Sequence, residues 1–570
     1  MKLDHGLRAR KWRAAFLALS ALIPSGAVLA ASPSLAAQPT LILYDGDVYT
    51  PTGWQHAVAV EGDKIVAVGN DAEILAMRVP ATVLVDLRGK TLLPGLHDSH
   101  SHPPFAGAKQ RECQLDETSD MAGLTAAISA CVKRARPGEW ITGGGWGMSH
   151  LKASPDRKIL DTIAPDNPVA LIDSSYHSRW VNSRALALAG ITRQTQPPKG
   201  GVIVRDAAGN PTGIVSEEAN DLIVAKIPPA TQQQIVGDLH WALGTMLENG
   251  ITSLTDAWIE TDVFAAYRAI DRAGTLDQRV IGCRRYQKGM KLSYEDQLAS
   301  GTRFSADCLK VFLDGVPLTP RTASVLVPYV GMEHDPEHAY GMLLLTPLQL
   351  EEVLGQADRM GLRVKMHAAG DGAVREAVDA VAAVRKKNGN LGKIHSIAHV
   401  GWIGEGDTAK ARAAGAALEF SPYVWFPSPG TQVARTVVGD ARMAGWYPVR
   451  KALDDGDIVI AGSDWPVVPS VNPWLAMETL VTRKAPGDVG DALSPANAVT
   501  FKEAFDIFTA NAAVAEGRRQ MLGAIEVGLL ADLIVTDQNP FKVAIGEVHK
   551  TKVTSVYIGG RAIPLPAARR

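Results

Sequence analysis

Residues 94–102 read PGLHDSHSH, a turn and an apolar residue followed by a run of polar side chains. Side chains two apart on a strand point the same way, so His100 and His102 can hold one ion together. Neutral imidazole is a ligand type that zinc and similar divalent metals take. The stretch therefore predicts part of a metal site at the end of a strand.

Three later polar residues stand at the ends of similar apolar runs: His367, His399 and Asp464. An isolated His-x-His pair is weak evidence for a metal, because surface and core histidines are common. A buried histidine or aspartate without partners is costly, however, so convergence of these residues on one ion is the favoured interpretation. Imidazole and carboxylate ligands with an open position for water are typical of metal-assisted hydrolysis.

The central part of the chain alternates between strand-like and helix-like runs. The expected strands are 250–255, 309–313, 362–366, 394–398, 416–420 and 458–461, and helix-period runs include 348–360 and 373–386. Such alternation favours an α/β fold with a parallel sheet, and a region this long suits a closed (β/α)8 TIM barrel. Barrel enzymes carry their chemistry where the strands end, which is where the ligand candidates stand.

The two ends of the chain show a different sequence pattern, in which short runs of β-favouring residues are separated by turn-forming residues. We expect them to form one small β-sandwich domain, residues 38–90 plus 510–570, beside a TIM-barrel hydrolase domain at 91–509. Residues from about 104 to 235 are too many for one strand-to-helix connection. They predict an inserted subdomain that shapes the substrate pocket.

Residues 1–37 have the layout of a secretory signal peptide, with basic residues followed by an apolar run from Ala14 to Ala31 that ends among small residues. A retained membrane anchor is the alternative, since the run is about long enough to span. The signal peptide is favoured by Pro24 and Gly26, which interrupt the apolar run, and by the small residues at its end, which are typical of a cleavage site. We therefore expect an exported protein, periplasmic or secreted.

Composition narrows the range of functions. The 570 residues are 46% hydrophobic and 21% charged, which indicates globular material with a large core. Removing a leader of net charge +4 takes the formal charge from −2 to −6, so the mature chain is mildly acidic. The mature chain has neither a basic block nor a second long apolar segment, so we expect a small-molecule substrate, no nucleic-acid binding and no stable membrane insertion. A homodimer is left open.

The four cysteines, at 113, 131, 283 and 308, form no Cys-x-x-Cys pair and have no metal-finger spacing. Export would allow a disulfide between Cys113 and Cys131, although sequence alone does not establish the geometry. For Cys283 and Cys308 we expect buried free thiols. Neither is expected to be catalytic.

Several phrases of the sequence together resemble the metal-dependent amidohydrolase superfamily. They are LPGLHDSHSH at 93–102, KVFLDG at 310–315, HAAGDGA at 367–373, IAH at 397–399, GSDWP at 462–466 and GLLADL at 528–533. Within that superfamily the chain is most similar to the YtcJ-like branch of amidohydrolase family 3, which includes N-substituted formamide deformylase. The resemblance runs from about residue 39 to 562.

The resemblance implies a ligand set taken from several barrel strands. His100 and His102 would come from strand 1, Lys310 from strand 4, His367 from strand 5, His399 from strand 6 and Asp464 from strand 8. A lysine in the strand-4 place can be carboxylated and bridge two metals, because a carbamate supplies anionic oxygens where an ammonium would repel the ion. The alternative is an unmodified Lys310 and one ion. Zinc is the expected metal.

The expected reaction is hydrolysis of an amide-type C–N bond other than a peptide bond. Asp464 would accept a proton from the attacking water and pass it to the departing amine. His177, Asn182 and Trp465 are candidate substrate contacts, with helix capping, surface or packing roles as the alternatives. An ester or lactone hydrolase or a deaminase on the same scaffold, or a binding protein without catalysis, stays open.

Overall fold

The computed structural model describes residues 37–147, 151, 154–174, 177–198, 201–292, 301–318, 321–424, 429–487 and 489–566. The expected signal peptide, residues 1–37, lies outside these ranges except for its last residue. Among the helices of the described residues, none is both long and apolar enough to cross a bilayer.

Eight parallel strands form the central sheet. In order they are β8 (Leu96–Ser101), β15 (Ile251–Ile259), β16 (Arg279–Arg285), β17 (Phe304–Phe312), β18 (Arg363–His367), β19 (Ser396–Ala398), β20 (Ala417–Phe420) and β21 (Ile458–Ala461). Each strand pairs in parallel with the next, as the right-handed β-α-β connection favours. The predicted α/β barrel is confirmed. Strand β16 was not among the expected strands, because both of its ends carry arginine and only its middle is apolar.

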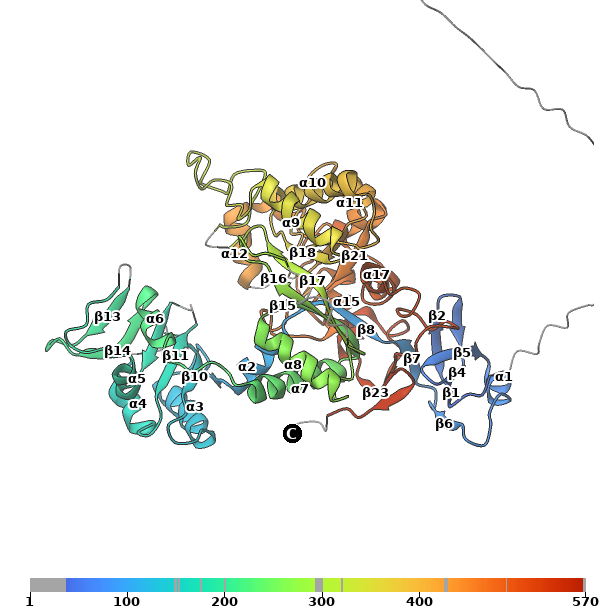
Figure 1. Ribbon diagram of the computed structural model, residues 1–570, viewed down its shortest axis with the longest axis horizontal. Coiled ribbons are helices and arrows are strands. Elements are labelled where there is room, and N and C mark those ends of the chain that lie inside the picture. Colours follow the sequence, from blue (N-terminus) through green and yellow to red (C-terminus); the bar gives the residue numbers. More distant parts are fainter. Residues whose placement is uncertain are drawn as a thin grey trace, which may run out of the picture. The chain divides into compact units, whose positions relative to one another are not determined.

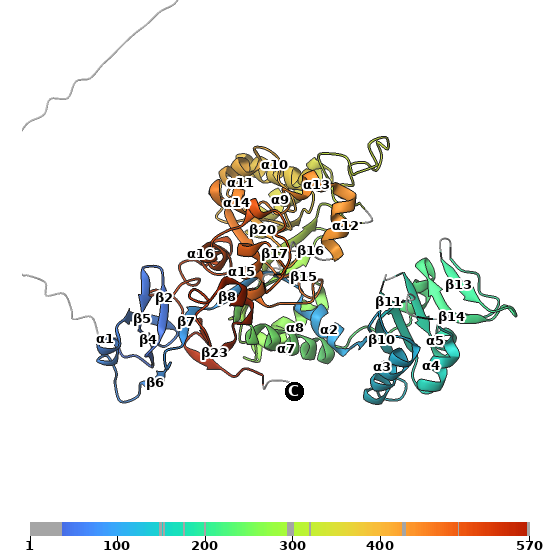
Figure 2. The same ribbon diagram turned by 180° about the vertical axis from the view of Figure 1, so that it is seen from behind.

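Helices follow most of the barrel strands. They are α7 (Gln232–Glu248), α8 (Thr261–Arg272), α9 (Pro347–Arg359), α10 (Asp371–Asn388), α11 (Asp407–Ala414), α12 (Pro429–Val438), α13 (Asp440–Met443), α14 (Val449–Asp454), α15 (Pro473–Thr482), α16 (Phe501–Ile507) and α17 (Ala510–Ala515), with short 3-10 turns at Pro495–Asn497 and Ile545–Lys550. Helices α9, α10 and α11, in yellow and orange, lie outside the strands in Figure 1 and, from behind, in Figure 2.

Helix α9 shows why these segments are helical. Thr346 and Gln349 form a capping box, and Pro347 occupies the first turn, where its missing N–H costs nothing. Leu350, Val353 and Leu354 then recur with helical spacing and are buried. The helices expected at 348–360 and 373–386 are confirmed as α9 and α10.

Hydrogen bonds and close packing connect β8, the first barrel strand, with the segment that follows β21, the last barrel strand. The buried Asp98 carboxylate accepts hydrogen bonds from the backbone N–H of Ser463 at 3.0 Å and from its hydroxyl at 2.6 Å. Gly462 lies so close to β8 that an added Cβ would fall 2.3 Å from the Cβ of His100. Only glycine allows this approach, which places the segment after β21 directly beside His100.

Strands from the two chain ends share one sheet, with the order β24-β23-β22-β7-β2-β3. These are β2 (Asp47–Thr50), β3 (Gly53–Gln55), β7 (Thr91–Pro94), β22 (Leu533–Thr536), β23 (Val553–Ile558) and β24 (Arg561–Ile563). A second sheet holds β1 (Leu41–Tyr44), β4 (Ala57–Glu61), β5 (Lys64–Gly69) and β6 (Val83–Asp86), and α1 spans Asp71–Leu75. Leu43, Val58, Leu533 and Tyr557 share one buried cluster, so residues from both ends contribute to a common core.

The long segment between β8 and β15 has a sheet of its own. Its strands are β9 (Cys113–Gln114), β10 (Ile141–Trp146), β11 (Val169–Asp173), β12 (Ser178–Val181), β13 (Val202–Arg205) and β14 (Pro211–Ser216). Its helices are α2 (Pro103–Arg111), α3 (Met121–Arg134), α4 (Arg157–Ile163), α5 (Ser183–Leu188) and α6 (Asn220–Val224), with a 3-10 turn at Glu217–Ala219. Trp146 and Trp180 are buried in its core. Its contribution to a substrate pocket stays a prediction.

Two disulfides join the four cysteines. Cys113 of β9 is bonded to Cys131 of α3, and Cys283 of β16 is bonded to Cys308 of β17. The expectation of free thiols at 283 and 308 was wrong. The two residues lie opposite each other in the β16–β17 pairing, with Cα atoms 4.2 Å apart, which the sequence could not indicate while β16 was unrecognised.

Candidate metal centre

The predicted ligand residues stand at the carboxyl ends of five barrel strands. His100 lies in β8 and His102 just after it; Lys310 lies in β17 and His367 ends β18; His399 follows β19 and Asp464 follows β21. In the order of the barrel, these are strands one, four, five, six and eight. Because parallel strands present their carboxyl ends at one rim, these side chains come to the same place.

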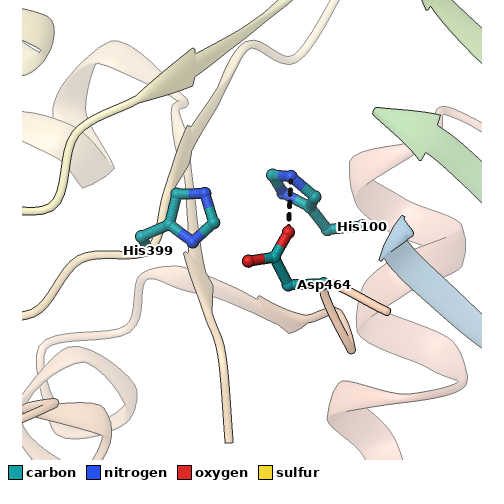
Figure 3. A group of neighbouring side chains, drawn as sticks. All are labelled: His100, His399 and Asp464. Carbon is teal, nitrogen blue, oxygen red and sulfur yellow. Dashed lines mark ion pairs between the residues drawn. The ribbon is translucent and has the colours of Figure 1, made fainter. Parts of the chain in front are cut away.

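The side chains meet in space. The Asp464 Oδ1 atom lies 3.2 Å from His102 Nε2 and 3.7 Å from His100 Nε2. Ligand atoms of His100, His399 and Asp464 all lie within 4.8 Å of one another, and Figure 3 shows the carboxylate facing the His100 ring. Lys310 Nζ is 3.2 Å from His100 Nε2, and the His367 ring centroid is 4.4 Å from that of His399. The structure thus brings all six residues together.

Two of these residues have unusual backbone geometry. His399 has φ +77° and Asp464 has φ +59°, in the left-handed region that side-chain-bearing residues seldom adopt. Holding a non-glycine residue there costs on the order of 1–3 kcal/mol, and such residues cluster at functional sites. For Asp464 the conformation is held by a hydrogen bond from its N–H to the His100 carbonyl at 2.7 Å. The backbone therefore fixes where the carboxylate points.

His100 is oriented by a buried chain of charges. Its Nδ1 atom makes a close contact with the Glu419 carboxylate on β20, and the other oxygen of that carboxylate is paired with Lys365 on β18. All three side chains are buried. A carboxylate on Nδ1 fixes the imidazole tautomer, so the Nε2 lone pair is left facing Asp464 and Lys310.

Two further imidazoles have one nitrogen occupied. The Nε2 atom of His367 lies 3.0 Å from the carbonyl oxygen of Gly315, and the Nδ1 atom of His399 lies 3.1 Å from the Ser421 hydroxyl. When His367 Nε2–H donates to that carbonyl, the Nδ1 lone pair is left for an ion. Each ring is thus held by one nitrogen while its other nitrogen can act as a ligand.

Burial sets the charge of the cluster. It lowers the pKa of His367 to about 4 and holds the pKa values of His100 and His399 well below the usual histidine value, so these rings are neutral near pH 7. Burial, reinforced by nearby Lys365, also lowers the pKa of Lys310 to about 7. A metal ligand must be an unprotonated imidazole, which is the state that burial favours here.

This donor set fits a divalent metal ion. Imidazole nitrogen and carboxylate oxygen are the ligands that zinc takes in hydrolytic sites. Nitrogens of several neutral imidazoles and the Asp464 carboxylate meet at one end of the barrel. Gathering neutral rings and a carboxylate in this way is costly unless an ion joins them.

The three candidate substrate residues have other contacts. Asn182 is buried and caps α5, accepting hydrogen bonds from the N–H groups of Ala185 and Val169 at 3.0 Å. His177 is exposed in the inserted segment and pairs with Glu217 at 3.0 Å. The Trp465 ring is 7% exposed and stacks on Trp241 of α7, with centroids 5.8 Å apart. These contacts match the capping, surface and packing alternatives.

Sequence reasoning missed the residues that support the ligands. Glu419, Lys365 and Asp98 are charged residues inside barrel strands, and all are buried. Asp314 is a fourth: its carboxylate accepts hydrogen bonds from the backbone N–H groups of Ser324, Ala369 and Gly370, each at 2.9 Å. For Glu419 the available signal was a charge in an otherwise apolar strand, because such residues are almost never fully buried unless paired.

Glu419→Gln is expected to weaken metal binding about 10–100-fold, because His100 loses the carboxylate that orients it and raises its basicity. The change also leaves the buried Lys365 ammonium without a counter-charge, which lowers the free energy of unfolding. Competition with a chromophoric chelator measures the affinity, and urea unfolding measures the stability.

Two further variants separate these effects. The double variant Lys365→Met/Glu419→Gln removes both charges, so it should recover stability without recovering metal affinity. Glu478→Gln removes another buried carboxylate that contacts a histidine, His549 Nδ1 at 2.7 Å, and should not change metal affinity. An unchanged affinity in Glu419→Gln, or an equal loss in Glu478→Gln, would contradict the assigned role.

Comparison with known proteins gives consistent results. The model of the family described as "Amidohydrolase family" matches residues 83–564. N-substituted formamide deformylase of Arthrobacter pascens is 28% identical over 522 residues, which are 88% of this chain and 94% of that protein. YtcJ of Bacillus subtilis (strain 168) is 27% identical over 492 residues, covering 85% and 91% of the two chains.

A crystal structure from Pyrococcus furiosus, described as an uncharacterized metal-dependent hydrolase, is similar over 88% of this chain and 100% of that one. Its TM-score is 0.71 at 24% sequence identity. This likeness supports the barrel fold.

Proposed function

The chain belongs to the amidohydrolase family, and on that premise we propose that it hydrolyses a carbon–nitrogen bond, other than a peptide bond, in an amide-like small molecule. The similarity to a formamide deformylase over most of both chains supports an amide substrate. The observation that carries the proposal is the Asp464 carboxylate, held 3.2 Å from His102 Nε2 and 3.7 Å from His100 Nε2 at one end of the barrel.

The residues that would hold the metal are His100, His102, His367, His399 and Asp464, with zinc as the expected ion. When bound, a divalent ion polarises the substrate carbonyl and lowers the pKa of the attacking water. Asp464 accepts the proton that this water loses and returns it to the nitrogen of the departing amine. The product pair is then a carboxylic acid and an amine.

We propose in addition that Lys310 carries a carboxylated amine. Its Nζ atom lies within the cluster, and its pKa of about 7 favours the neutral amine that adds to carbon dioxide with loss of a proton. The resulting carbamate offers two anionic oxygens to metal ions, whereas an ammonium would repel them. Two ions per chain are expected with the carbamate, and one ion per chain would contradict it.

Export from the cytoplasm is also proposed. The leader-like residues 1–37 support it, and so do the two disulfides, since such bonds persist mainly in oxidising compartments. Unprocessed protein accumulating in the cytoplasm of the producing cells would contradict it.

The proposed function is tested on matched substrates. The zinc-loaded mature protein is incubated with an N-acyl amine and with the ester of the same acyl group and the corresponding alcohol, and products are measured by mass spectrometry. We expect release of the amine, with kcat/KM for the amide above that for the ester once each value is divided by its uncatalysed rate. Cleavage of the ester alone would replace the amide assignment by an esterase on the same scaffold.

A further inference from the structure

A hollow of about 410 Å³ lies at the carboxyl ends of β15, β16 and β17, the neighbouring strands of the barrel in Figure 1. Its lining includes the side chains of Trp258, Arg285, Lys288, Phe312, Leu344 and Leu345. No residue of the proposed metal centre is among them. The hollow is nevertheless part of the same rim of the barrel.

Strand register places the hollow directly beside the metal centre. Arg285 of β16 stands opposite Lys310 of β17, and Phe312 of β17 stands opposite His367 of β18. The Phe312 ring centroid is 5.2 Å from that of His367, and Lys310 Nζ is 5.1 Å from the Phe312 centroid. A substrate whose carbonyl lay among the metal ligands could therefore extend a substituent into this hollow.

The walls of the hollow are largely apolar and aromatic. Trp258 and Phe312 meet edge to face with ring centroids 5.3 Å apart, and Leu344 and Leu345 add aliphatic side chains to the lining. Phe105, 43% exposed, continues the aromatic surface from Trp258 at 5.8 Å toward His102 at 5.6 Å. Such a surface suits a flat or large apolar group, since pockets for small molecules are built mainly from these side chains.

A positive charge stands over this apolar surface. The Arg285 guanidinium lies 4.5 Å from the centre of the Trp258 ring, and stacking of this kind limits its freedom before any ligand arrives. Its carboxylate neighbour is Glu260, at 4.0 Å, which is beyond hydrogen-bonding distance; Glu260 instead accepts a hydrogen bond from the Trp258 indole N–H at 2.8 Å. The fork of N–H donors on Arg285 therefore remains available to a bound anion.

The charge of the lining points to an anionic ligand. Among the described residues that line the hollow, Arg285 and Lys288 are cationic and none is acidic. A planar guanidinium matches a carboxylate with two parallel hydrogen bonds, which a lysine alone does not provide. An apolar wall and one oriented guanidinium together select a ligand that has both an apolar group and a carboxylate.

We propose that this hollow binds the amine portion of the substrate, and that the substrate is an N-acylated amine with an aromatic or large apolar group and a carboxylate, as in an N-acyl aromatic amino acid. The apolar group packs on Trp258 and Phe312, and the carboxylate pairs with Arg285. Arg285 is thus a specificity-determining residue. The inference rests on the proposed amide hydrolysis for its chemistry and adds the class of amide.

The test compares N-formylphenylalanine with N-formylphenethylamine, which differs only in lacking the carboxylate. With the zinc-loaded wild type we expect kcat/KM to be about 10–100-fold higher for the carboxylated amide, the range of a charge-assisted hydrogen bond, with most of the difference in KM. Arg285→Met should remove this ratio, and Arg285→Lys should restore part of it. Arg284→Met is the matched control, because its guanidinium lies over Phe264 at 5.9 Å and the ratio should persist.

Each alternative outcome is decisive. Equal cleavage of both amides by the wild type, or a ratio that survives in Arg285→Met, overturns the inference while amide hydrolysis stands. If neither amide is cleaved, binding of 3-phenylpropanoate and of its neutral amide is measured by calorimetry. Tighter binding of the carboxylate that is lost in Arg285→Met supports the hollow independently of turnover. Equal binding of the two ligands, or binding unchanged in Arg285→Met, rejects it.

Discussion

Asp464→Asn is expected to lower kcat on an amide substrate by about 10²–10⁴-fold, the range for removing a positioned acid–base group. The carboxamide keeps the shape of the side chain but cannot accept a proton from water and return it to the amine. The left-handed backbone at Asp464 and its hydrogen bond to the His100 carbonyl should still hold the side chain in place. Steady-state kinetics with product quantification measures the loss.

The control for this variant lies just before the strand that Asp464 follows. Asp457 precedes β21, whereas Asp464 follows it, and Asp457→Asn should turn over substrate as the wild type does. Metal content measured alongside separates loss of the proton carrier from loss of the ion. An Asp464→Asn protein that retains metal and wild-type turnover would reject the proton-transfer role.

Removing the metal is expected to abolish hydrolysis and to lower the melting temperature. Without an ion, the cost of burying His100 and His102 beside the partly exposed Asp464 carboxylate is offset only by their contacts with protein groups. An ion present at a hundredfold excess over its Kd stabilises the folded state by about 2.7 kcal/mol. Dialysis against a chelator, followed by an activity assay and calorimetry, measures both effects, and added zinc should reverse them.

His399→Asn provides the internal comparison. If the ion is held at this cluster, the chelator should change the melting temperature of His399→Asn much less than that of the wild type. His338→Asn, which alters an exposed histidine, should respond like the wild type. Full turnover by protein shown to be metal-free would exclude a metal-dependent reaction.

His367, His399 and Asp464 could be predicted because each stands near the end of an apolar run, and His100 and His102 because residues two apart on a strand point the same way. The barrel rule then assigns all such strand ends to one rim. Glu419 could not be paired with His100 in this way. The two residues are 319 positions apart, and their contact depends on the last strands closing against the first. The same limit applies to Cys283 and Cys308, whose partnership requires knowing that β16 exists and how it aligns with β17.

Local signals also have more than one meaning. The run at 182–185, an asparagine before a helix, fits a helix cap as well as a substrate contact, and Asn182 is a cap. The hollow beside the metal centre had no sequence signature at all, because Trp258, Arg285 and Phe312 come from three strands. Their adjacency follows from the register of β15, β16 and β17.

The join between β8 and β21 has a consequence for biosynthesis. His100 and His102 leave the ribosome several hundred residues before Asp464, yet they meet across the place where the first and last barrel strands touch. A nascent chain that ended before Gly462 would contain the imidazoles but not Asp464. If Asp464 carries the proton as proposed, we expect turnover to begin only after the segment that follows β21 has been synthesised and has folded against β8.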